Sequence, residues 1–371
     1  MTAVAGPEAR PQVRDSVVVL TDGRRVQFRC LMELRVKEFT VPPFVVDLIP
    51  RLDGTRTVPE LAAELAGSDG FTPGRLDDVL RTLRDEGLLR RAEVCAGDDR
   101  HERQRRFLAE LIDVHDELPT SAAQLQARLT GATVAVVGVG GAGSWLLHSL
   151  ALAGVGRLVL VDPDRVEVTN LNRQMLYGDG DVGAAKVDAA AAALRRVAPG
   201  VEVVGHPVHV ERPGDLAPLV EGADLLVCCA DRPSVSLASD LVATVAHATG
   251  TPHVVGGAYG ANLGVPGTSV IPGRTVCWAC VRQATADDHG TRALRPLKGR
   301  GAGSGSIGAV TAFVAAVMAW ESLRLLLGVP PALADQVREL DVMTLEWRVR
   351  PVQGRPGCAT CAGPGRLREP S

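Results

Sequence analysis

The chain has 371 residues, of which 46% are hydrophobic and 3% aromatic, and its formal net charge is −3. This length allows two domains with cores of their own, and the slightly negative charge argues against a general nucleic-acid or membrane-surface role. The N-terminus lacks the basic and apolar order of a signal peptide, so we expect a cytoplasmic protein.

The first 95 residues predict a small domain. An alternating run from Val17, broken by Asp22-Gly23, is typical of a hairpin. Helical segments follow at 42–52, 57–67 and 72–87, and a short strand at 88–94. This order predicts a winged-helix domain over residues 14–95. The segment shows no excess of basic residues, so we expect a peptide or protein ligand rather than DNA.

Residues 96–130 predict linker helices, including a charged helix at 98–114, and residues 131–371 predict an α/β domain. Apolar strand candidates alternate with helical runs and lie at 133–139, 157–162, 201–208, 223–230 and 252–258. Such alternation indicates a Rossmann-like, mainly parallel sheet with helices on both faces. The apolar run 309–328 contains Glu321 and Arg324, which favours a buried helix over a membrane span. The polar, glycine-rich residues 284–306 predict a long loop.

A glycine cluster follows the first of these strands. Gly138, Gly140, Gly141 and Gly143 lie between a strand and a helix, where glycines let the backbone approach a ligand's phosphates. Asp162 ends the next strand, at the position of an acid that binds ribose hydroxyls. On these residues alone, a dinucleotide (NAD) site is the alternative to an ATP site.

The residues after Asp162 favour ATP. Asn170, Arg173, Gln174 and Lys186 are polar groups suited to a triphosphate, and Lys186 is one of only three lysines in this arginine-rich chain. Asp231 follows the fourth strand, where ligands bind in such sheets, and a carboxylate there can hold Mg²⁺.

Four cysteines form two CxxC pairs, Cys277 with Cys280 and Cys358 with Cys361. This spacing predicts a structural zinc site, and two separate redox pairs are the alternative. The other four cysteines, Cys30, Cys95, Cys228 and Cys229, lack such spacing.

The motifs "GVGGAG", "VDPDRVEVTNLNRQ", "VGAAK" and "CADRP", with the CxxC pairs in order, resemble the ThiF/MoeB-type adenylating enzymes. The resemblance covers about residues 100–363. It implies ATP-dependent adenylation of a carboxylate, with Asp162 on the ribose, Asn170, Arg173 and Lys186 on the phosphates, and Asp231 on Mg²⁺. It also implies a homodimer in which an N-terminal arginine acts in the partner's site. Arg103 matches best, with Arg105 and Arg106 as alternatives.

Some members of this family carry the product on a loop cysteine. No cysteine lies between Cys280 and Cys358 here, so we do not expect a thioester relay.

The segment 14–94, with "LDGTRTVPEL" and "LRDEGLL", is similar to PqqD-like domains, which bind leader peptides of ribosomal natural products. The resemblance implies that the leader adds as a strand to the small sheet, at 26–29 or 33–36, and packs on the helix at 72–86. We therefore expect leader-dependent adenylation of a carboxylate or amide in a precursor peptide. The alternatives are adenylation of a sulfur-carrier protein and a non-catalytic peptide-docking partner of a cyclodehydratase.

Overall fold

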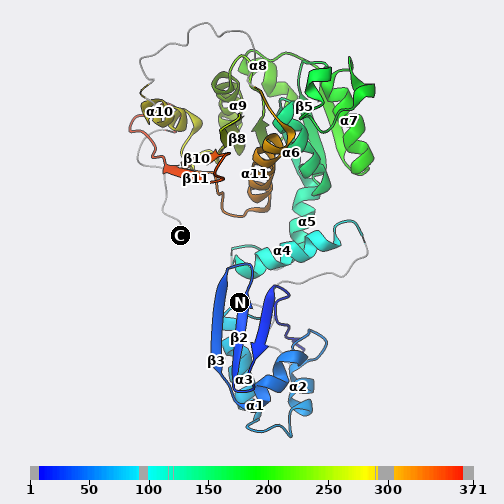
Figure 1. Ribbon diagram of the computed structural model, residues 1–371, viewed down its shortest axis with the longest axis vertical. Helices are drawn as coiled ribbons and strands as arrows, with labels where there is room; N and C mark the ends of the chain where they lie inside the picture. Colours follow the sequence, from blue (N-terminus) through cyan, green and yellow to red (C-terminus); the bar gives the residue numbers. More distant parts are fainter. Residues whose placement is uncertain are drawn as a thin grey trace. The chain divides into compact units, whose positions relative to one another are not determined.

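The computed structural model describes residues 8–91, 99–115, 117–119, 121–288, 290 and 305–361. The chain divides into two compact units, residues 1–126 and 127–371 (Figure 1).

The first unit contains a three-stranded antiparallel sheet in the order β1-β2-β3. Its strands are β1 (Val17–Thr21), β2 (Arg25–Cys30) and β3 (Arg35–Thr40). The predicted hairpin is confirmed, since β1 pairs with β2 around Asp22-Gly23. The candidate edge at 33–36 overlaps the start of β3, but the rest of this strand was not predicted, because its sequence RVKEFT mixes charged and apolar residues and none of its side chains is fully buried.

Two expectations for this sheet need correction. Residues 26–29 lie in β2, the central strand, so they cannot form an edge that accepts a peptide. The return strand expected at 88–94 is reduced, within residues 88–91, to one bridge between Val13 and Leu89. Residues 92–94 lie outside the described part of the chain.

The helices of the first unit bury one side of the sheet. They are α1 (Pro43–Leu48), η1 (Ile49–Arg51), α2 (Val58–Glu64) and α3 (Pro73–Asp85). Thr57 caps α2 in a reciprocal capping box with Glu60, and Thr72 caps α3. Leu76, Leu80 and Leu83 on one face of α3 join the apolar core beneath Val26 and Phe28.

A buried charge cluster joins α4 (Glu102–Val114) to the N-terminal elements of the same unit. Arg14 is 2% exposed and lies 2.7 Å from Glu33 and 3.4 Å from Glu110. Glu110 also accepts hydrogen bonds from Ser16 Oγ, at 2.6 Å, and from Arg90, at 3.1 Å. Because buried charges are costly unless paired, this cluster fixes α4 against the first residues of the unit. The helix α5 (Ala122–Gly131) follows.

The second unit is built on an eight-stranded sheet in the order β11-β10-β9-β8-β7-β4-β5-β6. The strands are β4 (Thr133–Val137), β5 (Arg157–Val161), β6 (Glu202–His206), β7 (Leu225–Cys228), β8 (His253–Tyr259), β9 (Leu263–Val270), β10 (Gln336–Asp341) and β11 (Trp347–Pro351). The five predicted strands are β4 to β8, and the pairings among these five are all parallel. The three further strands pair antiparallel and extend the sheet beyond β8.

Helices cover both faces of this sheet, which confirms the predicted fold class. Val134 and Val136 of β4 face α6 (Gly141–Leu152), α7 (Lys186–Val197) and α11 (Gly308–Leu327), whereas Ala135 and Val137 face α8 (Pro213–Leu216) and α9 (Val235–Thr249). This alternation is the two-residue period of a strand buried on both sides. The short helices η2 (Val168–Asn170), η3 (Asp179–Asp181) and η4 (Ala217–Leu219) lie in the connections.

The helix α11 has the length and apolarity to cross a membrane by composition alone. It packs, however, against α6, β8 and β9. Glu321, 1% exposed, accepts hydrogen bonds from Ser269 Oγ and from the backbone N–H groups of Ala332 and Leu333. The carboxylate that interrupts the apolar run thus ties the helix to its own unit, in agreement with the buried helix that the sequence predicts.

The loop expected at 284–306 begins later than predicted, because α10 (Trp278–Asp288) continues through its first residues. Residues 291–304 lie outside the described residues.

Candidate functional site

The glycine cluster makes a tight turn between β4 and α6. Gly138 has φ +93°, and a Cβ atom on it would lie 2.5 Å from the backbone nitrogen of Ala230. A Cβ on Gly143 would lie 2.1 Å from the carbonyl oxygen of Gly138. Both positions therefore require glycine, Gly138 because of its backbone angle as well. The turn brings the N-terminus of α6, with its unpaired N–H groups, to the carboxyl edge of the sheet.

A cavity of about 1380 Å³ lies along this edge, in the second unit. It is lined by residues from the ends of β4 to β8, where ligands bind in doubly wound sheets. The predicted residues that line it are Gly138, Gly140, Gly141, Asp162, Asn170, Arg173, Gln174, Lys186 and Asp231. Gly143 is not among the lining residues, since it packs against the turn itself.

Asp162 holds the backbone at the mouth of the glycine turn. It is 5% exposed, and its two oxygens accept the N–H groups of Val139, at 2.6 Å, and Asp164, at 2.8 Å. A carboxylate can accept more bonds than these two, so it retains acceptor capacity for a ligand hydroxyl. Lys186, at the start of α7, is 6% exposed and places its Nζ 2.9 Å from Asp164 Oδ2.

The polar residues around η2 face the same cavity. Asn170 accepts the N–H of Glu167 at 3.1 Å, and Arg173 donates to the carbonyl of Thr169 at 2.8 Å. Gln174 is 3% exposed, and its Oε1 has no hydrogen-bond partner among the described residues. Gln174 also lines the cavity, so its amide group lies beside the space that a ligand would fill.

Asp231 is exposed in the turn after β7 and lines the cavity. A hydrated carboxylate at that place suits a hard cation such as Mg²⁺.

The sequence analysis missed several polar residues that line the cavity, and two of them bear on its chemistry. Asp164, two positions after Asp162, binds the ammonium group of Lys186. The motif "DPD" at 162–164 was the sequence feature that could have pointed to it. Tyr259 on β8 also lines the cavity, and no local motif pointed to it.

The three candidate arginines for a partner's site lie on α4 in the first unit. Arg105 is buried and bonds Asp99 at 2.9 Å, and Arg106 pairs with Glu102. Arg103 and Arg106 are both exposed, and of these two Arg106 has an ion pair with Glu102, so both are open to a second protein chain.

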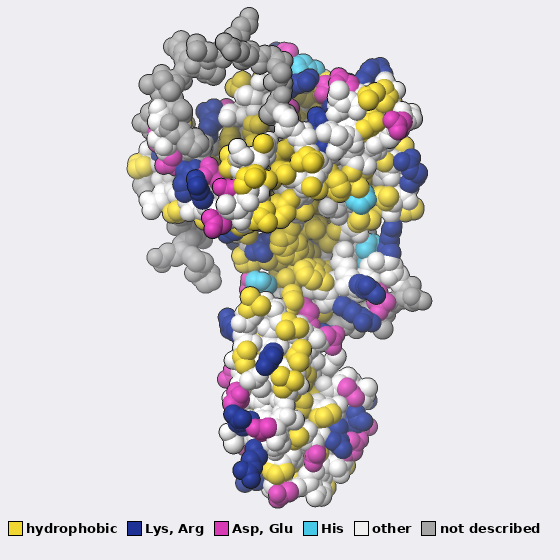
Figure 2. Space-filling model, in the orientation of Figure 1, with side chains coloured by type: hydrophobic (Ala, Val, Ile, Leu, Met, Phe, Trp, Pro, Cys, Tyr) yellow, Lys and Arg dark blue, Asp and Glu magenta, His cyan; other side chains and the backbone are white. Residues whose placement is uncertain are grey.

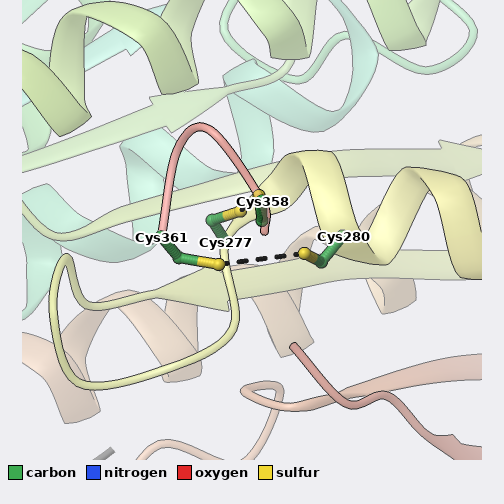
Figure 3. Close-up of side chains that lie close together, drawn as sticks. All are labelled: Cys277, Cys280, Cys358 and Cys361. Atoms are coloured by element: carbon green, nitrogen blue, oxygen red, sulfur yellow. Dashed lines mark hydrogen bonds between the residues drawn. The ribbon is translucent and has the colours of Figure 1, made fainter. Parts of the chain in front are cut away.

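The four paired cysteines come together as predicted (Figure 3). Their sulfur atoms all lie within 4.8 Å of one another, and the separations Cys277–Cys358 and Cys280–Cys361 are 3.6 and 3.8 Å. Zn–S bonds of about 2.3 Å in a tetrahedron place sulfurs about 3.8 Å apart. The cluster therefore fits a zinc ion, and it joins the start of α10 to the segment after β11. The backbone N–H of Arg355 points to Cys280 Sγ at 3.4 Å, as an outer-shell donor would.

Comparisons with known proteins agree with this fold. The ThiF family model matches residues 112–360. The bovine "Adenylyltransferase and sulfurtransferase MOCS3" is 35% identical over 261 residues, which are 69% of this chain and 53% of that protein. The chain thus matches about half the length of that relative. The "Sulfur carrier protein adenylyltransferase" of Thermus thermophilus is 32% identical over 256 residues, 68% of this chain and 90% of that protein.

Among solved structures, Escherichia coli MccB with ATP superposes with a TM-score of 0.73 at 18% identity, over 95% of this chain and 99% of that one. MccB has also been solved with N-formylated MccA, with a TM-score of 0.72. At this identity the likeness shows the fold. From the family match and the curated relatives, the chain belongs to the ThiF family.

Proposed function

We propose that the protein is a leader-peptide-dependent adenylating enzyme, which activates a carboxylate or amide of a ribosomal precursor peptide with Mg-ATP. The observation that carries the proposal is that the superposition on MccB includes the N-terminal unit. This unit lies almost wholly outside the ThiF match at 112–360. The superposition spans 95% of the chain, so it must include most of the N-terminal unit. MccB is the protein solved with ATP and with MccA.

In the proposed reaction the cavity binds ATP along the edge of the sheet. Asp162 takes the ribose, and Asn170, Arg173, Gln174 and Lys186 surround the phosphates. Asp231 carries Mg²⁺, which neutralises phosphate charge when bound. The carboxylate of the peptide attacks the α-phosphate, an acyl adenylate forms, and pyrophosphate leaves. Fixed cations offset the negative charge that gathers as two anions approach.

The N-terminal unit would hold the leader on its sheet. In the part of this unit that the structure describes, the edge strands of the sheet are β1 and β3. Lys37 of β3 bonds Glu86 at the end of α3, with Nζ 2.7 Å from Oε2. The β3 edge is therefore the one beside α3, and we assign the leader to it by strand addition.

Activation of a sulfur-carrier protein is the second candidate, because one relative at 32% identity is named as a sulfur carrier protein adenylyltransferase and another at 30% as a molybdopterin-synthase adenylyltransferase. ATP–pyrophosphate exchange separates the two. We expect exchange with a precursor peptide encoded beside this chain's gene, and much less with the same peptide lacking its leader. Exchange only with a carrier protein favours the second candidate, and no exchange with either favours a docking partner without activity.

A homodimer completes the proposal, with Arg103 of one chain serving the site of the other. Support comes from apolar side chains gathered on the face of the second unit where α6 and α11 lie (Figure 2). Leu152 of α6 and Phe313 of α11 are 45% and 46% exposed. Exposed apolar patches of this kind commonly mark protein interfaces.

A further inference from the structure

Tyr259, the last residue of β8, reaches the first residue of α6. A Cβ atom on Gly141 would lie 2.0 Å from the Tyr259 hydroxyl and 3.1 Å from Thr311 Cγ2. The phenol and the Thr311 methyl therefore fill the space that any side chain at position 141 would need. Thr311 is fully buried on α11, so the ring is backed by a rigid wall.

The strand order separates Tyr259 from the ribose acid. Asp162 follows β5, on one side of β4, whereas β8 lies two strands away on the other side. Neighbouring strands are about 4.8 Å apart, so the edge from β6 to β8 spans roughly 19 Å. With ribose at Asp162 and phosphate at the N-terminus of α6, the second substrate must approach from the β7–β8 side, where Tyr259 contacts Gly141.

Side chains of α11 line the cavity on the same side. A Cβ on Gly257 would lie 3.1 Å from both the sulfur and the Cε of Met318, and Met318 is 1% exposed. Met318 and Val314 both line the cavity. The passage to the phosphate is thus bounded by packed side chains of α11 and by the Tyr259 ring.

We propose that Tyr259 determines the specificity of the acyl subsite: its ring admits a reacting terminal residue with a small side chain and excludes a bulky one. This inference rests on the proposed adenylation. Burial raises the pKa of Tyr259, against the opposing hydrogen bonds of Thr311 and Arg173. The phenol is therefore neutral at physiological pH and acts through its bulk.

The test uses stable mimics of acyl adenylates, namely sulfamoyl adenosines bearing N-acetylglycyl, N-acetylalanyl or N-acetylleucyl groups. Affinities for the full-length protein are measured by calorimetry. We expect the wild type to bind the glycyl compound at least about tenfold more tightly than the leucyl compound. One methylene group more or less in a pocket of fixed size changes the affinity by about this factor. Tyr259→Ala should reduce the ratio to about twofold, and Tyr259→Phe should retain it. All compounds share one nucleotide, so the ratio cancels changes in nucleotide affinity.

Tyr177→Phe is the matched control, since Tyr177 is the other tyrosine of the chain and donates to the carbonyl of Val139 at 2.8 Å. Its ratio should equal that of the wild type. If Tyr259→Ala does not fold, Tyr259→Leu removes the end of the ring and should lower the ratio in the same direction. An unchanged ratio in the folded variant, or equal wild-type affinities, overturns the role of Tyr259 while ATP still binds. A wild type that binds neither ATP nor any mimic overturns the proposed function itself.

Discussion

The ammonium group of Lys186 lies 2.9 Å from the carboxylate of Asp164, and the backbone N–H of Lys186 donates to the carbonyl of the same residue at 2.9 Å. These two bonds fix the first residue of α7 beside the β5 end of the cavity. The lysine is almost wholly buried, whereas the Asp164 side chain is 40% exposed. A phosphate entering the cavity would meet a cation already held in place.

We expect Lys186→Ala to reduce ATP–pyrophosphate exchange by about 100-fold or more, since a fixed charge at a developing anion has an effect of that size. The fold should survive, because Asp164 stays hydrated when its partner is removed. Lys186→Arg keeps the charge in a different geometry and should recover little activity. Exchange rates and melting curves are the measurements, and wild-type exchange in a folded Lys186→Ala protein contradicts the assignment.

Asp231→Ala should abolish exchange in the same assay, because the proposed Mg²⁺ ligand is lost. The side chain is exposed, so the melting temperature should be nearly unchanged. Activity that persists without this carboxylate would place the metal elsewhere.

Purified protein should contain about one zinc ion per chain, measured by elemental mass spectrometry. Cys358→Ser should lose the metal and lower the melting temperature, because the ion joins two segments far apart in sequence. Cys30→Ser is the control, since Cys30 is buried in the first unit and should leave the zinc content intact. A metal-free wild type with full stability would favour two redox pairs instead.

The charge cluster at Arg14 predicts a pH dependence of stability. Burial alone would raise the pKa of Glu33, but the hydrogen bond and charge of Arg14 outweigh it and hold the pKa below the ordinary value of 4.5. A carboxyl group whose pKa is lower in the folded than in the unfolded protein stabilises the fold at any pH above its unfolded pKa. This stabilisation is lost as the pH falls through the folded pKa. Melting temperatures between pH 7 and pH 3 should therefore fall less steeply in Glu33→Gln than in the wild type. Parallel curves would show that this pair contributes nothing.

Glu110→Ala should lower the stability of the fold more than Glu33→Gln does, because Arg14 and Arg90 lose a shared buried partner. Breaking such a buried pair costs about 3–5 kcal/mol. Chemical denaturation gives the free energy of unfolding of the first unit in each variant. Glu102→Ala, on the same helix, is the control. A loss below about 1 kcal/mol, the usual size for surface pairs, would contradict the burial of this cluster.

Phe313 packs on Trp347 with ring centroids 6.3 Å apart, and both rings are partly exposed. If this surface forms the proposed homodimer, Phe313→Asp should shift the protein toward a monomer in light scattering. Leu31→Asp, at an exposed position in the first unit, should not. A wild type that is monomeric at all concentrations disproves the dimer and, with it, a role for Arg103 in a partner's site.

Local patterns determined much of this protein. The apolar runs of β4, β5 and β7 are buried on both faces and therefore visible in the sequence. The glycine turn, Asp162 and Lys186 follow from motif spacing, because each lies at a strand end or a helix start. The two CxxC pairs were also recognisable in the sequence, since the two cysteines of each pair are only three positions apart. The strand β9 was not predicted because it contains Gly264, Pro266 and Gly267, which are unusual inside a strand.

Only the tertiary structure decided which of these residues meet. Asp164 was visible in the sequence, but its bond to Lys186 depends on how the turn after β5 packs against the start of α7. Tyr259 stands 118 positions after Gly141 in the chain, and no local pattern relates them. Their contact exists because β8 pairs beside β7 and so returns the end of a distant strand to the glycine turn. Pairing of strands joins residues across any sequence distance, and for that reason the walls of the cavity had to be read from the fold.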